Sequence, residues 1–531
     1  MATSPVTIPH SQNGIDSEAQ SGIAGVDASP PSSLYFVRSM VEKPQSLIRE
    51  IAFVGVLCMA QFMTQAGMGQ AIAPLQIIGK SFETQNPGQL SWIVAAYSLT
   101  VGTFILVAGR LGDLYGHKKF FVGGFLWFAL WSLLAGFSCY SSLAFFYCCR
   151  AFQGIGPAFL LPNAIAILGR SYEPGRRKQM IFSIFGAAAP GGFVFGATFS
   201  ALLGQLAWWP WAYWVMAIAC LLLAGAGVLV IPHTPHPKID DSVSLVMRVD
   251  AWGAITGVTG LVFVNFAWNQ GSVVGWTPPY TYVLLIVGFL FLGLFAFIES
   301  RATFPLLPIA ALSTDSAFVL GCIAAGWSSF GIWLFYIWQF MEESRGNSPL
   351  LASAQFVPVA IIGLCASVTT GIVLNRLPAS VVMLISMLAF TIGGVLIATT
   401  PIEQSYWAQT FISIIVMPWG MDMSFPAATI LLSNAMPREH QGIAASLVNT
   451  VINYSISIGL GFAGTIESQI NDGGLEILKG YRGAWYMGIG LSSLGVFVSI
   501  LFGVSGMATS RRKLSGEPPS PKKCPNPAAA S

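Results

Sequence analysis

The feature that most constrains this chain is a series of apolar runs, each about 20 residues long, between two polar ends. A run of this length is what an α-helix needs to cross the hydrocarbon core of a bilayer. The runs lack the two-residue alternation of barrel strands, so helices are expected. We predict fourteen membrane-spanning helices, at residues 51–73, 90–109, 119–138, 142–168, 180–204, 208–231, 251–270, 279–298, 316–340, 351–373, 379–399, 406–431, 443–464 and 484–506.

Charged residues are too few for a soluble protein of this size. Only 9% of the 531 residues are charged and 54% are hydrophobic, whereas an ordinary soluble domain carries about 25% charged residues. This shortage excludes a soluble enzyme, a disordered scaffold and a conventional nucleic-acid binder, and it indicates the lipid bilayer as the surrounding medium. The eight cysteines form no CxxC pair, so neither a metal site nor a disulfide framework is expected, and no cofactor motif is present.

The basic residues indicate the orientation of the spans. An even number of spans places both termini on one side of the membrane. With the termini inside the cell, 20 of the 25 Lys and Arg residues fall in inner segments and four in outer ones. Because inner loops of membrane proteins are enriched in Lys and Arg, we expect both termini to be cytoplasmic. The one remaining basic residue, Arg150, lies inside a span.

The spans divide into two halves. We expect a six-helix N-terminal half at residues 50–231 and a six-helix C-terminal half at 315–506, with disordered cytoplasmic tails at 1–49 and 507–531. Residues 232–314 are expected to hold a cytoplasmic loop, a two-helix insertion and an in-plane linker. Charge alone fits twelve spans as well as fourteen, but length and apolarity favour fourteen. The similar segments EPGRRKQMIFS and MPREHQGIAAS, one in each half, fit parallel repeats of the kind found in transporters.

A glycine-rich loop after the second span carries the first family resemblance. Residues 109–119 read GRLGDLYGHKK, in which glycines allow a tight turn and one Asp among cations can pair at the inner face. The loop resembles the G-x-L-x-D-x-x-G-x-K-K motif of the major facilitator superfamily, with Leu114 where the family often has a basic residue. The resemblance implies a cytoplasmic gating motif formed by Gly109, Asp113, Gly116 and Lys118.

Two further motifs lie inside spans. RAFQGIG, from Arg150, resembles the R-x-x-Q-G-x-G motif of the same superfamily, and a cation within a span is a functional candidate. The alternative is that Arg150 snorkels or only ties helices together. Span five resembles the Gly-Pro-Gly-Gly motif of the family's antiporters, although Ala189 replaces one glycine. Close packing and a bend are expected at Gly186, Pro190, Gly192 and Gly196, and ordinary helix packing is the alternative.

The first span departs from the family pattern. Gln65 occupies the Asp position of the L-D-x-T-I-V-N-V-A-L-P signature of fourteen-span drug:proton antiporters, and Gln cannot titrate. Asp422 in span twelve is the one carboxylate expected deep in a span. A carboxyl group in a medium of low dielectric constant is favoured in its neutral form, which suits a group that loads and unloads a proton. The alternatives are a structural Asp that is hydrogen-bonded to its neighbours, or an Asp close enough to the inner surface to stay hydrated.

Uncharged polar and aromatic residues recur in the spans, where they are expected to face a cavity or a partner helix rather than lipid. For any single one, a hydrogen bond between helices is the alternative. The cavity candidates are Gln61, Gln65, Gln153, Asn449, Asn453, Trp333, Tyr336 and Gln339.

Taken together, residues 50–506 resemble the major facilitator superfamily, and the stretch from Gly420 to Asn453 resembles its fungal aminotriazole-resistance branch of drug:proton antiporters. The resemblance implies an all-α integral membrane protein with about 14 helices in a two-half bundle. It also implies proton-coupled efflux of a drug, toxin or secondary metabolite by alternating access, in the plasma membrane.

The expected partners are a small-molecule substrate, the proton gradient and the bilayer, with no nucleic acid, and the chain is expected to act as a monomer. Gln65 and the uncharged polar residues favour an alternative, a uniporter or importer of a small polar solute or ion. An enzyme is not expected, because all five histidines fall in predicted tails or loops and no GxxxxGK[ST] pattern occurs.

Overall fold

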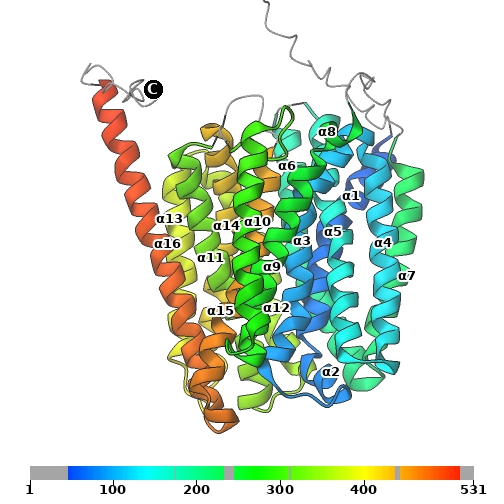
Figure 1. Ribbon diagram of the computed structural model, residues 1–531, viewed down its shortest axis with the longest axis vertical. Helices are drawn as coiled ribbons and strands as arrows, with labels where there is room; N and C mark the ends of the chain where they lie inside the picture. Colours follow the sequence, from blue (N-terminus) through cyan, green and yellow to red (C-terminus); the bar gives the residue numbers. More distant parts are fainter. Residues whose placement is uncertain (1–45, 174, 233–243, 310–311, 437–442, 515–531) are drawn as a thin grey trace, which may run out of the picture. The chain divides into compact units, whose positions relative to one another are not determined.

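The structure is a computed structural model, and it describes residues 46–514 apart from 174, 233–243, 310–311 and 437–442. Fourteen helices among these residues are long and apolar enough to cross a membrane, which confirms the predicted number. They stand side by side (Figure 1). The first begins at Leu47 and the last ends at Leu514. The predicted tails at 1–49 and 507–531 therefore lie for the most part outside the described residues.

Six long helices and one short one come from the N-terminal part of the chain. Pro87 begins the third of them, and the Asn86 side chain caps it by accepting a hydrogen bond from the Gly88 backbone N–H at 2.9 Å. Gly116 ends the same helix with φ = 100°, a conformation that favours glycine. The helices are α1 (Leu47–Ile72), the short α2 (Leu75–Ser81), α3 (Pro87–Tyr115), α4 (His117–Phe137), α5 (Leu143–Ser171), α6 (Arg176–Leu206) and α7 (Pro210–Val230).

Six long helices form the C-terminal part. Helix α11 (Thr314–Gln339) continues into a π-helical turn at Phe340–Ser344. The others are α12 (Pro349–Val373), α13 (Ala379–Ala398), α14 (Gln409–Ala435), α15 (Ala444–Ile470) and α16 (Ile477–Leu514).

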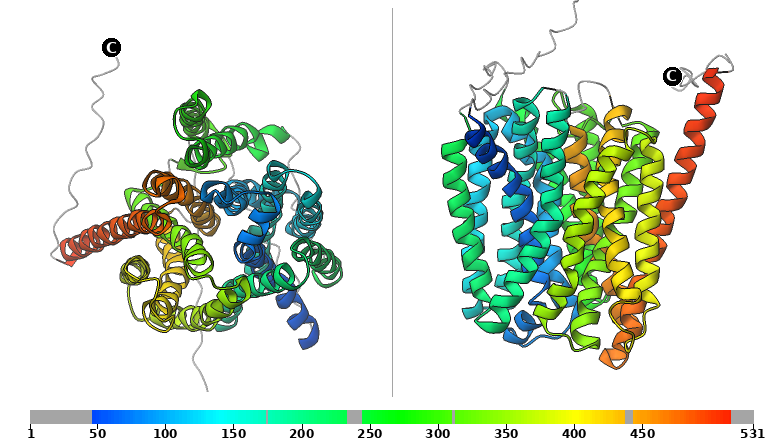
Figure 2. Two further views of the ribbon diagram at one scale, coloured as in Figure 1. Left: turned by 90° about the horizontal axis from the view of Figure 1, so that it is seen from below. Right: turned by 180° about the vertical axis from the view of Figure 1, so that it is seen from behind.

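A helical hairpin is inserted between the two sets. It consists of α9 (Ala251–Val274) and α10 (Pro279–Arg301), preceded by the short α8 (Leu245–Val249). Helix α9 contacts α3 and α15, and α10 packs on α9. Seen along the helix axes, the hairpin lies to one side of the other helices (Figure 2). Only 11% of the most apolar stretch of α10 is buried, so this helix presents its surface to lipid.

The two six-helix sets meet along two helix pairs, α3 with α15 and α6 with α12. In the first pair, Ser457 Oγ donates to the Ala95 carbonyl oxygen at 2.8 Å, and Gly109 lies against the Ser446 hydroxyl. Ala95 and Gly109 are about 20 Å apart along α3. In the second pair, Ser353 Oγ donates to the Ala197 carbonyl at 3.4 Å. The halves are therefore in contact along most of the membrane's thickness.

Candidate functional site

A small cavity lies where the two halves meet. Its walls come from α1, α6, α11, α12, α14 and α15, so both halves contribute to it. Its volume is about 40 Å³. A single buried water needs roughly 10–15 Å³, so the cavity has room for a few waters or for one small solute.

Aromatic rings and two amide side chains line this cavity. Gln65 of α1 and Asn453 of α15 supply the amides, and Trp333 of α11 is one of the rings. The sequence analysis identified these three residues as cavity candidates. Asn453 Nδ2 donates to the Asn449 carbonyl oxygen at 3.0 Å, so its Oδ1 is left as an acceptor. No Lys, Arg, Asp or Glu residue is among the lining residues in the described part of the chain.

The other cavity candidates lie elsewhere among the described residues. Gln153 is fully buried in the N-terminal half, where its Nε2 donates to Ser132 Oγ at 2.7 Å. Gln339 accepts a hydrogen bond from Gln76, which joins the two halves near the C-terminal ends of α1 and α11. The remaining three candidates do not line the cavity either: they are Gln61, Asn449 and Tyr336. Tyr336 is buried, with its ring centroid 5.5 Å from that of Tyr481.

Asp422 sits beside the cavity, at the contact between the halves. Its neighbour Met421 lines the cavity. A Cβ atom built on Gly363 of α12 would lie 2.9 Å from Asp422 Oδ2 and 2.6 Å from Cγ of Pro190 on α6. Ser367 is a hydrogen-bonding neighbour of the carboxylate. Oδ2 is buried without a hydrogen-bond partner among the described residues. Pro190 thus packs on the same glycine as Asp422.

Arg150 is fully buried in the N-terminal half, away from the cavity. Its Nε donates to the Ile93 carbonyl oxygen at 3.0 Å, and Nη1 donates to Gln153. The guanidinium lies over the Tyr97 ring, 4.5 Å from its centroid. Arg150 forms no ion pair with an acidic residue among the described residues. The carbonyl and amide oxygens and the Tyr97 ring therefore stabilise its charge. Arg150 and Asp422 lie in opposite halves and do not form a pair.

Three of the four residues of the span-five motif lie at close helix contacts. A Cβ on Gly192 would fall on the Phe62 backbone, and one on Gly196 would fall on the Ala66 backbone. These two glycines therefore let α6 approach α1 closely. Pro190, within α6, faces α12 instead. Gly186 has nothing within 4 Å of a built Cβ.

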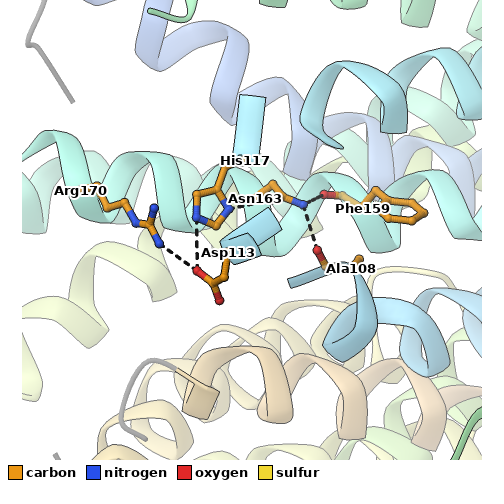
Figure 3. A network of polar contacts seen from close by, with 6 residues as sticks. All are labelled: Ala108, Asp113, His117, Phe159, Asn163 and Arg170. Atoms are coloured by element: carbon orange, nitrogen blue, oxygen red, sulfur yellow. Dashed lines mark hydrogen bonds and ion pairs between the residues drawn. The ribbon is translucent and has the colours of Figure 1, made fainter. Parts of the chain in front are cut away.

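Asp113, one of the four residues of the predicted gating motif, belongs to a polar network in the N-terminal half (Figure 3). Asp113 Oδ1 accepts from Arg170 Nη2 at 2.8 Å and lies 3.4 Å from His117 Nε2. His117 Nδ1 is 2.8 Å from Asn163 Oδ1, and Asn163 Nδ2 donates to the Phe159 carbonyl oxygen at 2.7 Å. The network links the ends of α3, α4 and α5. His117, assigned to a loop from sequence, is instead the buried first residue of α4.

Two more contacts tie helix ends together in the N-terminal half. Lys118 Nζ donates to the Val228 carbonyl oxygen at 2.8 Å and also to Ile231, at the C-terminal end of α7, where a cation is favourable. Glu50 of α1 forms an ion pair with Arg177 of α6 and accepts from the Tyr172 hydroxyl at 3.0 Å. Burial and the hydrogen bond to Glu50 both raise the pKa of Tyr172, so this tyrosine remains a neutral donor.

Several residues at the cavity were not identified from sequence. Trp327 and Phe330 of α11 and Phe356 of α12 line it together with Trp333. Aromatic residues in a span are typical of ordinary core packing, so their composition gives no signal. Their spacing does give one: residues 327, 330 and 333 recur every three positions on one helix. Within the described residues, no group of three or more His, Cys, Asp or Glu could hold a metal ion.

The chain matches one family model and is similar to several fungal transport proteins. The family model described as Major Facilitator Superfamily matches residues 56–325 and 317–528. The chain is 71% identical to the low affinity ammonium transporter of Saccharomyces cerevisiae over 89% of this chain and 92% of that protein. It is 55% identical to an efflux pump of Aspergillus terreus over 87% of this chain and 89% of the pump.

A more distant relative and a solved structure extend the comparison. The aminotriazole resistance protein of Saccharomyces cerevisiae is 38% identical over 87% of this chain and 86% of that protein. Among solved structures, a peptide transporter in complex with sulfate matches with a TM-score of 0.65 at 13% identity, covering 90% of this chain and 98% of the other. At this identity the likeness concerns the fold alone.

Proposed function

Because the chain belongs to the Major Facilitator Superfamily, whose two-half helical fold it shares, we propose that it carries a small polar solute of the size of ammonium across the membrane by alternating access. The observation that carries this proposal is the cavity between the halves, which is about 40 Å³ in volume and has no charged lining residue in the described part of the chain. The 71% identity to a protein named a low affinity ammonium transporter supports it. This was the alternative function that Gln65 favoured in the sequence.

The contacts between the halves suggest how such a cycle would run. The halves touch along the pairs α3–α15 and α6–α12, and three of these helices, α6, α12 and α15, also line the cavity. The hydrogen bond between Gln76 and Gln339 holds the halves together at the outer side. In an alternating-access cycle the two halves rock about the solute, so this bond must break when the cavity opens outward.

Uptake into proteoliposomes tests this proposal. Purified full-length protein is reconstituted, and uptake of radiolabelled methylammonium, a close analogue of ammonium, is measured at a pH at which the amine is almost wholly protonated. We expect saturable uptake that unlabelled ammonium inhibits. Uptake no faster than into protein-free liposomes would overturn the proposal.

A second candidate, proton-coupled efflux of a small organic compound, is favoured by Asp422. Inside the membrane, a charged carboxylate with an unpartnered oxygen is costly. If Asp422 must take up a proton before the halves can change conformation, transport would be coupled to protons. The relatives named as efflux pumps, such as the one from Aspergillus terreus, support the same function.

The Asp422→Asn variant tests this second candidate. In proteoliposomes loaded with a panel of drugs and toxins, an imposed pH gradient is expected to drive efflux by the wild type but not by Asp422→Asn. Asp315→Asn, at the exposed start of α11, is the matched control and should behave as the wild type. Gradient-driven efflux that persists in Asp422→Asn would remove Asp422 from the coupling mechanism.

The same proposal includes the setting of the protein: a monomer in the plasma membrane with both termini in the cytoplasm. The distribution of Lys and Arg supports the orientation. Epitope tags at the two ends should be accessible to antibodies only after the plasma membrane is permeabilised, and a tag labelled in intact cells would refute it.

A further inference from the structure

Five aromatic rings line the cavity between the halves; one, Phe193, comes from α6 and the other four come from α11 and α12. Trp327, Phe330 and Trp333 lie along α11, and Phe356 faces them from α12. The ring centroids of Trp327 and Phe330 are 5.2 Å apart, and those of Trp333 and Phe356 are 5.7 Å apart. Phe330 stacks on Trp333 at 6.0 Å with an interplanar angle of 26°. The four rings from α11 and α12 form a continuous wall, which we call the aromatic wall.

The polar edges of the two indoles point away from the cavity. Trp327 Nε1 donates to Ser424 Oγ at 3.0 Å, and Trp333 Nε1 donates to Ser413 Oγ at 2.9 Å. Both serines are fully buried on α14, and Ser413 Oγ in turn donates a hydrogen bond to the Gly393 carbonyl oxygen at 2.7 Å. The indole N–H groups are therefore fully engaged. The two rings therefore present carbon atoms to the cavity.

The polar groups that do reach the cavity include a free acceptor. Asn453 holds its Nδ2 on a backbone carbonyl, which leaves Oδ1 to accept a hydrogen bond. Gln65 makes no hydrogen bond to another described residue and can turn its own carbonyl oxygen inward. A π wall with amide oxygens, and without charged side chains, suits a cation of low charge density that also carries N–H donors.

On the premise of the proposed transport function, we propose that the aromatic wall binds the solute as a cation, ammonium or a small alkylammonium, by cation–π contact with Trp327 and Trp333 and a hydrogen bond to Asn453. A neutral amine would gain little from π-electron density. A divalent cation would require more oxygen ligands than two amides provide. Each such ring contact contributes roughly 2- to 30-fold in affinity.

Fluorination of a single tryptophan tests this directly. Fluorine withdraws π-electron density while leaving the shape of the ring almost unchanged, so a merely structural role for the ring would not respond to it. Progressively fluorinated tryptophan is placed at position 333, and in a second series at 327, of the full-length protein in lipid nanodiscs. The dissociation constant for radiolabelled methylammonium is measured by equilibrium binding.

Trp338 provides the matched control. It lies on the same helix, is 1% exposed, and stacks on Phe356 with ring centroids 4.7 Å apart, yet it does not line the cavity. We expect the dissociation constant to rise stepwise with fluorination at 333 and 327, by at least threefold at the highest substitution, and to stay unchanged at 338.

The outcomes separate this inference from the function on which it rests. A wild-type protein that binds methylammonium with an affinity unaffected by fluorination at 333 and 327 would overturn the cation–π site alone. A wild-type protein that neither binds nor transports methylammonium would overturn both. An equal loss of affinity at 333, 327 and 338 would also overturn the site, because it would indicate a general effect on the fold.

Discussion

The contact between α3 and α15 gives the sharpest structural prediction. A Cβ atom built on Gly102 would lie 2.7 Å from the Tyr454 backbone nitrogen and 3.0 Å from the Thr450 carbonyl oxygen. Both atoms belong to the backbone of α15, so no side chain can turn aside to make room. The Gly102→Ala substitution therefore forces the two helices apart by several tenths of an ångström.

The size of the effect follows from this geometry. Overpacking of this kind costs about 1–3 kcal/mol, and the cost applies only in the state in which the helices touch. The gain in helix propensity from Gly to Ala is the same in both states and cancels. The equilibrium should therefore shift about 5- to 150-fold toward the state in which α3 and α15 separate.

Cysteine accessibility measures this shift. In a variant whose native cysteines are replaced, the Asn453→Cys substitution places one thiol at the cavity. We expect Gly102→Ala to raise the rate of labelling by a membrane-impermeant maleimide at least fivefold. Gly123→Ala on α4 is the control, because a Cβ there meets nothing within 4 Å. Identical labelling with and without Gly102→Ala, in protein that remains monodisperse, would refute the role of this contact.

Three further substitutions follow from the site. Gly192→Ala should destabilise the protein by about 1–3 kcal/mol in a thermal unfolding assay, because the added Cβ meets the backbone of α1. Gly186→Ala is the control and should be neutral or slightly stabilising. Equal melting temperatures for the two variants would contradict this. Asp113→Asn removes a partly exposed ion pair within the N-terminal half that is worth about 0.2–1 kcal/mol. It should therefore lower the free energy of unfolding by that amount, while Asp472→Asn in an exposed turn should leave it unchanged, and an unfolding free energy equal to that of the wild type would contradict the ion pair. Arg150→Lys replaces a planar guanidinium, whose donors bond to Ile93 and Gln153, with a single ammonium group. We expect it to lower the free energy of unfolding by about 2 kcal/mol or more. An unchanged melting temperature would contradict the role of these buried hydrogen bonds.

The sequence predicted the architecture well, because the thickness of the bilayer fixes the length of a span whatever its neighbours are. It also identified Gln65, Asn453 and Trp333, which line the cavity, since a polar or mixed residue inside a span needs a partner away from lipid. The pattern of one helix does not reveal which helix faces it. Gln153 therefore had the same sequence signal as Gln65, although it hydrogen-bonds within the N-terminal half.

The aromatic wall was not identified from the sequence, for a different reason. Trp327, Phe330 and Phe356 have the composition of core residues, and their role depends on serines from α14 that hold the indole N–H groups away from the cavity. Such a contact joins residues about eighty or more positions apart in the chain. The same holds for His117, whose partner Asn163 comes from another helix and turns an expected loop residue into a buried one.

The central claim is that the two halves enclose one small cation at a time and expose it to each side in turn. Trans-stimulation tests it most directly: proteoliposomes of the wild-type protein are preloaded with unlabelled ammonium, and the initial rate of radiolabelled methylammonium uptake is compared with that of unloaded vesicles. Alternating access around the cavity predicts faster, saturable uptake into the loaded vesicles. Uptake that rises linearly with concentration and does not respond to internal ammonium would contradict the claim.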